Sequence, residues 1–309
     1  MSLFLGIDTS NYTTSVALLD SCGKVIQKKR LLPVKEGERG IRQSDAVFHH
    51  TKAYPELFED LMKEASEPIC AVGVSVSPTT EKGSYMPCFL VGESFATALS
   101  SALKVPLFKF SHQQGHIASA LYSSNKTELF YEKFIAFHVS GGTTDAVLCE
   151  SVDKTFKIIP VASSNDLKAG QAVDRIGVKT GLLFPCGKEM EKLALKSERI
   201  YKNKIKLYDG DCSLSGLENK CLNMLQNGES IEDTAKFLFC YIADTLSEMV
   251  KDIFEKYGEL PLVFAGGVMS NSIIREIITS RFSAFFAEPE FSCDNAAGVA
   301  LLAKLNYFK

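Results

Sequence analysis

The sequence predicts an α/β protein built from two equivalent lobes. Segments typical of strands alternate with segments typical of helices along most of the 309 residues. A chain of this length is about twice as long as a typical domain. Residues 5–20 (LGIDTSNYTTSVALLD) and 135–150 (IAFHVSGGTTDAVLCE) share a strand, a Ser/Thr/Gly turn, two threonines and a second apolar strand. This similarity indicates an internal duplication with one copy in each lobe.

The duplicated segments each predict a β-hairpin, because two short apolar or β-branched runs flank a polar turn. The first hairpin pairs residues 3–8 with 13–19, and the second pairs 134–139 with 144–149. Between them, residues 91–103 are expected to form an amphipathic helix, with Phe95 and Leu99 one turn apart.

The C-terminal half contains the clearest predicted helix, residues 230–257. Ser230 and Asp233 are typical of a helix start, and Gly258 is typical of a helix end. A buried strand is predicted at 262–265, followed by a helix from about residue 271 and a last helix at 295–306.

Composition and charge exclude several classes of protein. The chain has 34 Lys and Arg against 37 Asp and Glu, a net charge of −3, which excludes a globally basic nucleic-acid binder. No apolar run reaches the ~18 residues of a membrane span, and the first residues lack the basic region of a signal peptide. Nine cysteines without a CxxC pair are typical of reduced thiols. We therefore expect a cytoplasmic protein with no membrane partner.

Two of the five histidines, His112 and His116, have a spacing that suits a metal ion. Residues i and i+4 share one face of a helix, so both imidazoles can bind the same ion. Gln113 occupies the position where a zinc protease of this pattern has its glutamate base, which argues against proteolysis. Asp294 is the candidate third ligand, and two histidines with one carboxylate leave open positions typical of a catalytic ion. The alternative is a pair of ordinary helix histidines.

Glycine- and hydroxyl-containing turns form the second candidate site. Thr9 and Ser10 in the first hairpin, and residues 140–143 (SGGT) in the second, are expected to offer hydroxyl and backbone N–H groups to phosphate oxygens. The late loop at 266–267 would let the backbone approach a flat or anionic ligand. Each turn alone has an ordinary steric explanation. Together they indicate a nucleotide held between duplicated lobes.

Seven segments, in order, resemble the glycoprotease-like (TsaD/Gcp) family, which contains the tRNA adenosine threonylcarbamoyltransferases. They are GIDTSNYTTSVALLD, SHQQGHIASAL, HVSGGTTDAVL, DLKAGQAVDRIG, CSLSGL, VFAGGVMSN and CDNAAGVAL. The resemblance implies the bilobal ASKHA fold that actin, sugar kinases and heat-shock chaperone ATPases share. We expect a first lobe at 1–120, onto which a helix at 295–309 packs back, and a second lobe at 121–294.

The resemblance also implies cofactors and site residues. His112, His116 and Asp294 would hold one iron or zinc ion, and an adenine nucleotide (ATP, AMP or an acyl-adenylate) would bind nearby. With the late glycine loop included, the candidate nucleotide-binding residues are Ser140, Gly141, Gly142, Asp174, Gly187, Gly266, Gly267 and Asn271. The candidate catalytic residues are Asp8, Ser10 and Ser140.

The implied activity is metal-dependent transfer of a threonylcarbamoyl or carbamoyl group from an acyl-adenylate to an acceptor amine, above all a tRNA adenosine. The first turn lacks two of the family's acids near Tyr12 and Thr13, and SGGHT becomes SGGTT at Thr143, which indicates a divergent paralogue. The alternatives are carbamoylation of a small molecule, and a non-catalytic nucleotide-binding partner protein. Expected partners are tRNA and an ASKHA-family protein or a second copy.

A basic stretch in the second lobe is the candidate surface for tRNA. The alternative is a solvated helix face, because three glutamates partly balance the stretch. Its basic residues are Lys188, Lys192, Lys196, Arg199, Lys202, Lys204 and Lys206.

Overall fold

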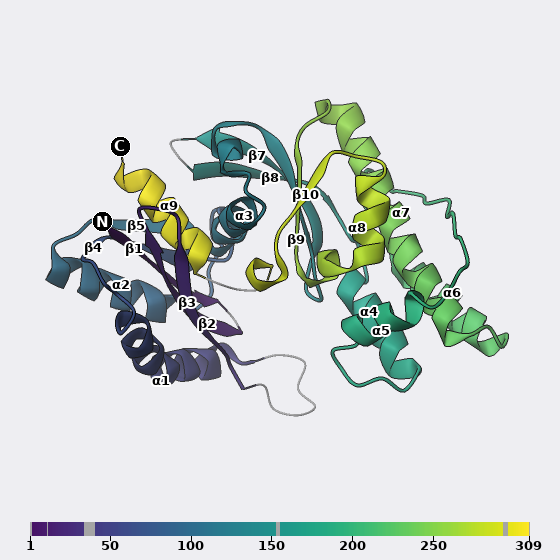
Figure 1. The fold of residues 1–309 in the computed structure, drawn as a ribbon, viewed down its shortest axis with the longest axis horizontal. Coiled ribbons are helices and arrows are strands. Elements are labelled where there is room, and N and C mark those ends of the chain that lie inside the picture. Colours follow the sequence, from purple (N-terminus) through teal and green to yellow (C-terminus); the bar gives the residue numbers. More distant parts are fainter. Residues whose placement is uncertain (1, 11, 34–40, 153–154, 293–295, 309) are drawn as a thin grey trace. The chain divides into compact units, whose positions relative to one another are not determined.

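The computed structural model describes residues 2–10, 12–33, 41–152, 155–292 and 296–308 (Figure 1). The chain divides into two compact units. Unit 1 comprises Met1–Glu132, Ser151–Ile158 and Glu290–Lys309, and unit 2 comprises Lys133–Glu150 and Ile159–Pro289. Each unit is centred on one β-sheet.

The sheet of unit 1 has five strands in the order β3-β2-β1-β4-β5. β1 is antiparallel to β2 and parallel to β4, which is parallel to β5. The strands are β1 (Leu3–Ser10), β2 (Thr13–Asp20), β3 (Val25–Leu31), β4 (Ile69–Ser77) and β5 (Leu107–Ser111).

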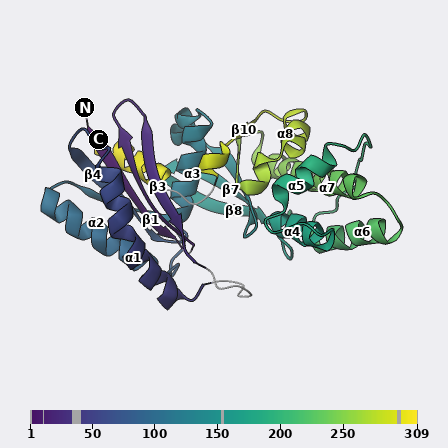
Figure 2. The same cartoon turned by 60° about the horizontal axis from the view of Figure 1, so that its bottom comes forward.

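Helices cover both faces of this sheet (Figures 1 and 2). Leu5 and Ile7 of β1 pack in one core with α1 (Gln43–Met62) and α2 (Phe89–Leu103). Alternate residues of a strand point to opposite faces, so Gly6 faces α9 (Ala297–Tyr307), where a Cβ would lie 2.2 Å from the Ala296 carbonyl oxygen. Asp8 shares that face with Gly6. The remaining helices of unit 1 are α3 (His112–Ser123) and the 3₁₀ helix η1 (Thr127–Tyr131).

The sheet of unit 2 repeats the same pattern in the order β10-β9-β6-β7-β8. β6 is antiparallel to β7 and parallel to β9, which is parallel to β10. The duplication predicted from the two hairpins is therefore confirmed. The strands are β6 (Phe134–Val139), β7 (Thr144–Val152), β8 (Thr155–Ser163), β9 (Leu262–Ala265) and β10 (Ala284–Phe286).

The core of unit 2 joins this sheet to a long buried helix, α7 (Ile231–Tyr257). α7 begins after Ser230, whose Oγ accepts a hydrogen bond from the Asp233 N–H at 3.1 Å, and ends before Gly258, as predicted. Other helical segments are α4 (Ala169–Lys179), α5 (Gly187–Ala194), α6 (Ser215–Gln226), η2 (Gly267–Ser270), α8 (Ser272–Thr279) and η3 (Pro289–Phe291). Among all described residues, no helix combines the length and the apolarity needed to cross a bilayer.

Candidate functional site

The histidine pair lies in the first two turns of α3. Ser111 caps this helix: its Oγ accepts a hydrogen bond from the Gln114 N–H, and Gln114 Oε1 accepts one from the Ser111 N–H. This reciprocal cap fixes where the helix begins. His112 and His116 then lie on one face, with their Nε2 atoms 2.9 Å apart. Two imidazole nitrogens therefore converge on one point.

The Asp8 carboxylate contacts His112 at Nδ1, the ring nitrogen that does not face His116. The carboxylate is fully buried, and Oδ1 lies 2.9 Å from His112 Nδ1 while Oδ2 accepts a hydrogen bond from the Ser10 N–H at 3.3 Å. A carboxylate that accepts the Nδ1–H of a histidine fixes the tautomer and the orientation of the ring, as is common for metal-binding histidines. Asp8 was predicted to be catalytic. The structure places it buried against the His112 ring, and its catalytic role stays a prediction.

The predicted exposure of Thr9 and Ser10 on a turn is wrong. The antiparallel pairing of β1 with β2 continues to the pair Ser10–Thr13, so both residues are buried inside the sheet. Thr9 Oγ1 donates to the Cys88 carbonyl and accepts from the Gly92 N–H. Ser10 Oγ is buried with no partner among the described residues. Neither residue is exposed in this structure, contrary to the prediction.

Asp294, the third predicted ligand, lies outside the described residues. Within them, no group of three or more His, Cys, Asp or Glu is placed to hold a metal ion. The helix that follows, α9, starts against α3: the Gly298 N–H donates to Ser119 Oγ at 2.9 Å. A Cβ on Gly298 would lie 1.9 Å from the carbonyl oxygen of Gly115, the residue before His116. Glycine at 298 thus permits this close approach.

His50 of α1 is a buried neighbour of the first hairpin. Its Nδ1 lies 2.8 Å from Thr14 Oγ1, and its Nε2 has no hydrogen-bond partner in the described part of the chain. Burial lowers the pKa of His50 to about 4, although the charge of Asp8 acts in the opposite direction. The ring is therefore neutral near pH 7.

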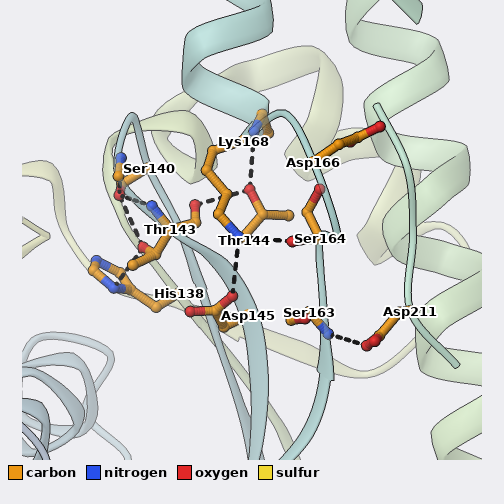
Figure 3. Close-up of polar contacts among 12 residues, drawn as sticks. His138, Ser140, Thr143, Thr144, Asp145, Ser163, Ser164, Asp166, Lys168 and Asp211 are labelled. Atoms are coloured by element: carbon orange, nitrogen blue, oxygen red, sulfur yellow. Dashed lines mark hydrogen bonds and ion pairs between the residues drawn. The ribbon is translucent and has the colours of Figure 1, made fainter. Parts of the chain in front are cut away.

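The second hairpin ends in an open turn at residues 140–143 (Figure 3). Ser140 Oγ accepts hydrogen bonds from the Gly142 and Thr143 N–H groups, both at 3.2 Å. A Cβ on Gly141 or Gly142 would meet no atom within 4 Å. The backbone of this turn is therefore accessible to a ligand.

This turn rests on the first turn of α4. The Gly170 N–H donates to the Ser140 carbonyl at 3.0 Å, and the Ala169 N–H donates to Thr144 Oγ1 at 2.9 Å. A Cβ on Gly170 would lie 2.6 Å from the Gly141 nitrogen, so only glycine allows this contact. The positive end of a helix dipole beside an exposed glycine turn is suited to a phosphate.

His138 is a residue that the sequence analysis missed. Its Nδ1 lies 3.0 Å from Thr143 Oγ1, which lies 2.9 Å from Ser140 Oγ (Figure 3). Hydrogen bonds thus connect the His138 ring to the Ser140 hydroxyl through Thr143 Oγ1. The available signal was the spacing of two between His138 and Ser140, because such residues point to the same side of a strand.

Asp174 and Gly187 are neighbours in space. Asp174 Oδ1 accepts a hydrogen bond at 2.8 Å from the N–H of Cys186, the residue before Gly187. Burial raises the pKa of Asp174. A Cβ on Gly187 would meet no atom within 4 Å, so the start of α5 is open above this glycine. A carboxylate thus lies beside accessible backbone, which suits a ribose or a base.

The late glycine loop divides into a structural part and an open part. Gly266 has φ +101°, and a Cβ there would lie 2.3 Å from the Val139 carbonyl oxygen, so this glycine serves the packing of β9 on β6. Its contact with a nucleotide stays a prediction. A Cβ on Gly267 would meet nothing. Asn271 caps α8 through Oδ1, and its buried Nδ2 has no partner among the described residues.

Comparison with solved structures defines the class of protein. The chain is similar to full-length HypF in its phosphate- and nucleotide-bound form, with a TM-score of 0.61 and 14% identity over 99% of this chain and 55% of that one. It is also similar to a ROK family glucokinase from Streptomyces griseus, with a TM-score of 0.56 and 10% identity over 98% of this chain and 99% of that one. The duplicated α/β architecture is the ASKHA fold, as predicted.

Sequence comparison identifies the family. The family model described as tRNA N6-adenosine threonylcarbamoyltransferase matches residues 24–301. A relative of that name from Streptococcus agalactiae serotype V is 30% identical over 99% of this chain and 93% of its own length. A second, from Streptococcus pneumoniae strain JJA, is 29% identical over 98% and 91%. The chain belongs to the tRNA N6-adenosine threonylcarbamoyltransferase family, a family of acyltransferases.

Proposed function

We propose that this chain transfers a threonylcarbamoyl group from an acyl-adenylate to the exocyclic amine of an adenosine in tRNA, with the help of one iron or zinc ion. The observation that carries the proposal is the convergence of His112 Nε2 and His116 Nε2, with Asp8 fixing the first ring. A metal site explains this arrangement better than a pair of ordinary helix histidines does, because an ordinary pair needs no buried carboxylate in contact with one of its rings.

The donor set fits such an ion. Metal–nitrogen bonds of about 2.1 Å bring two cis nitrogens to roughly 3 Å from each other, close to the separation in this structure. Asp294 would supply the third ligand. Two histidines and a carboxylate are also the ligands of non-haem iron sites. When bound, the ion supplies Lewis acidity toward a carbonyl or phosphate oxygen.

The residues of unit 2 would hold the adenylate. The open turn at 140–143 and the first turn of α4 suit its phosphate, and Asp174 suits the ribose hydroxyls as an acceptor. The buried Asn271 Nδ2 is a donor without a partner in the described chain, so it suits an acceptor atom of the nucleotide. His138 would stabilise this turn, because it is hydrogen-bonded to Thr143, and the Thr143 hydroxyl is hydrogen-bonded to Ser140 Oγ. Ser140 Oγ in turn accepts the N–H groups of Gly142 and Thr143.

The transfer balances without a redox partner. The adenosine nitrogen attacks the carbonyl carbon of the carbamoyl group and forms a C–N bond. The C–O bond to the phosphate breaks, AMP leaves, and the amine loses one proton. Backbone N–H groups near the leaving phosphate stabilise its charge as the bond breaks.

The test is incubation of the metal-loaded protein with threonylcarbamoyl-adenylate and bulk tRNA, followed by mass spectrometry of the nucleosides. Wild-type protein should form the modified adenosine. His116→Ala should abolish turnover while leaving the thermal stabilisation by AMP intact, and His49→Ala on α1 is the control that should behave as wild type. If wild-type protein transfers to no tRNA, carbamoylation of a small molecule or a non-catalytic role becomes the better explanation.

A further inference from the structure

A basic segment, residues 201–208 (YKNKIKLY), lies between α5 and α6 in unit 2 and shows the alternating burial that is typical of an extended chain. Its side chains alternate strictly. Tyr201, Asn203, Ile205 and Leu207 are partly buried, and Lys202, Lys204, Lys206 and Tyr208 are exposed. We propose that this basic segment binds the phosphate backbone of the acceptor RNA. The inference rests on the proposed function and names the surface that would recognise the tRNA.

The inward side of the segment is anchored to α7. Asp244, a buried residue of that helix, accepts hydrogen bonds from Asn203 through both its N–H (2.8 Å) and its Nδ2 (3.0 Å). Arg281 Nη2 donates to the other oxygen of Asp244 at 2.7 Å. The Tyr201 ring also meets the Phe237 ring edge to face, with centroids 5.3 Å apart. Because the backbone is fixed, the three lysines are held on the outer side with a set spacing.

The lysines of the segment are not neutralised by neighbouring acids. Among the described residues, none of the three has a carboxylate oxygen within 4.0 Å, whereas Lys192, Lys251 and Lys256 of the same unit each have one within 2.7 Å. Asp209, the nearest acid in sequence, interacts electrostatically with Lys256. Three uncompensated charges on one ordered edge form an electrostatic site for a polyanion.

The spacing and the aromatic end of the segment favour RNA over an acidic protein. Alternate residues of an extended chain recur about every 6.6–7 Å, which is comparable to the separation of successive phosphates along one nucleic-acid strand. Tyr208 is exposed at the end of the row, with Lys206 Nζ 5.2 Å from its ring centroid. An exposed aromatic ring next to a basic row offers a stacking surface for an unpaired base. The fitting partner is therefore a single-stranded or looped stretch of RNA.

Just after the segment, the chain at Asp211 and Cys212 is hydrogen-bonded to Ser163 of β8, and Figure 3 shows the Asp211–Ser163 contact. The Cys212 N–H donates to the Ser163 carbonyl at 2.9 Å, and Asp211 Oδ1 accepts from the Ser163 N–H at 2.6 Å. The next residue, Ser164, donates its N–H to the carbonyl of Thr144, beside the 140–143 turn. RNA held on the basic segment would thus continue toward the turn proposed to bind the adenylate.

The test measures binding of fluorescently labelled bulk tRNA by anisotropy between about 50 and 200 mM salt. K202Q/K204Q/K206Q should bind roughly 10- to 100-fold more weakly, and the slope of log affinity against log salt should fall by about 2–3. K133Q/K251Q/K256Q removes the same charge from ion-paired positions of unit 2 that lie outside the basic stretch, and should change affinity less than about threefold. K202R/K204R/K206R should restore wild-type binding. Y208L should weaken binding by roughly tenfold without changing the salt slope.

Equal losses in the two glutamine triple variants, or wild-type protein that does not bind tRNA, would overturn this inference. Thermal stabilisation by AMP checks that the variants are folded and that the nucleotide site is intact. If the first triple variant still modifies tRNA at wild-type rate at low tRNA concentration, the inference is wrong and the proposed function stands. If wild-type protein binds tRNA through the segment but transfers no group to it, the proposed function is wrong and the inference stands.

Discussion

The two hairpins share one backbone plan but differ in what their ends expose. Each is tied to the first turn of a following helix through a threonine hydroxyl: Thr9 accepts from the Gly92 N–H of α2, and Thr144 accepts from the Ala169 N–H of α4. In the first hairpin, pairing continues to Ser10 and buries the end of β1. In the second, the strand pairing stops at the pair Val139–Thr144, and two glycines remain open. One hairpin therefore contacts the histidine pair through Asp8, and the other leaves the backbone of its turn exposed.

The contact between the second turn and α4 should give the largest effect on stability. Gly170→Ala places a methyl group 2.6 Å from the Gly141 nitrogen, so backbone must move. We expect the free energy of unfolding to fall by about 2–3 kcal/mol, as measured by urea denaturation. The matched control is Gly142→Ala, whose methyl group meets no atom within 4 Å. Equal effects of the two changes would mean that the turn does not depend on close packing against the helix.

Affinity for the metal ion should depend on the carboxylate of Asp8 in the first hairpin and not on the second hairpin. Asp8→Asn keeps the shape but removes the charge that favours the Nδ1–H form, so affinity for Zn²⁺ should fall about 10- to 100-fold. Competition with a chelating dye measures this change. Asp145→Asn, on the second hairpin beside Lys168, is the control and should leave the affinity unaltered. A similar loss in both variants would contradict the division of roles between the hairpins.

The buried His50 should give the smallest effect, visible as a dependence of stability on pH. The pKa of His50 is lowered from 6.5 to about 4 in the folded protein. Between these values the unfolded chain binds a proton that the folded one does not, so stability falls as pH decreases. From pH 7 to 5, wild-type protein should lose about 1–2 kcal/mol more than His50→Gln. Parallel pH profiles of the two proteins in urea denaturation would show that His50 titrates normally.

The fold was largely predictable because its signals are local. Alternating apolar residues indicated the hairpins, and the Ser230 cap with Gly258 indicated both ends of α7. The repeat of one hairpin in the second half indicated the duplication. The end of β1 was not predictable from local pattern, because Thr9 and Ser10 have turn-like composition. Their place in the sheet depends on the contacts of Thr9 with Cys88 and Gly92, residues distant in sequence.

The site was predictable where spacing alone brings groups together. His112 and His116 lie on one helix face by periodicity, and the sequence sufficed to propose their convergence. The contact between Asp8 and His112 was not predictable from spacing, because it joins residues 104 positions apart. His138 was overlooked, since its link to Ser140 passes through the Thr143 hydroxyl. The close packing at Gly266 depends on the approach of β9 to β6. The Gly266-Gly267 pair in the sequence does not reveal this approach.

The helix α9 sets an order of events during synthesis. It is the last described helix of the chain, yet it covers Gly6 of the first strand and packs against Gly115 of α3. At ~5–20 residues per second, β1 would leave the ribosome roughly 15–60 s before α9 is complete. Throughout that interval one face of the first sheet lacks its helix, while all segments of unit 2 have already been made. Maturation of unit 1 therefore waits for the synthesis of α9, and a ribosome stalled before α9 would leave an apolar surface for chaperones or proteases to recognise.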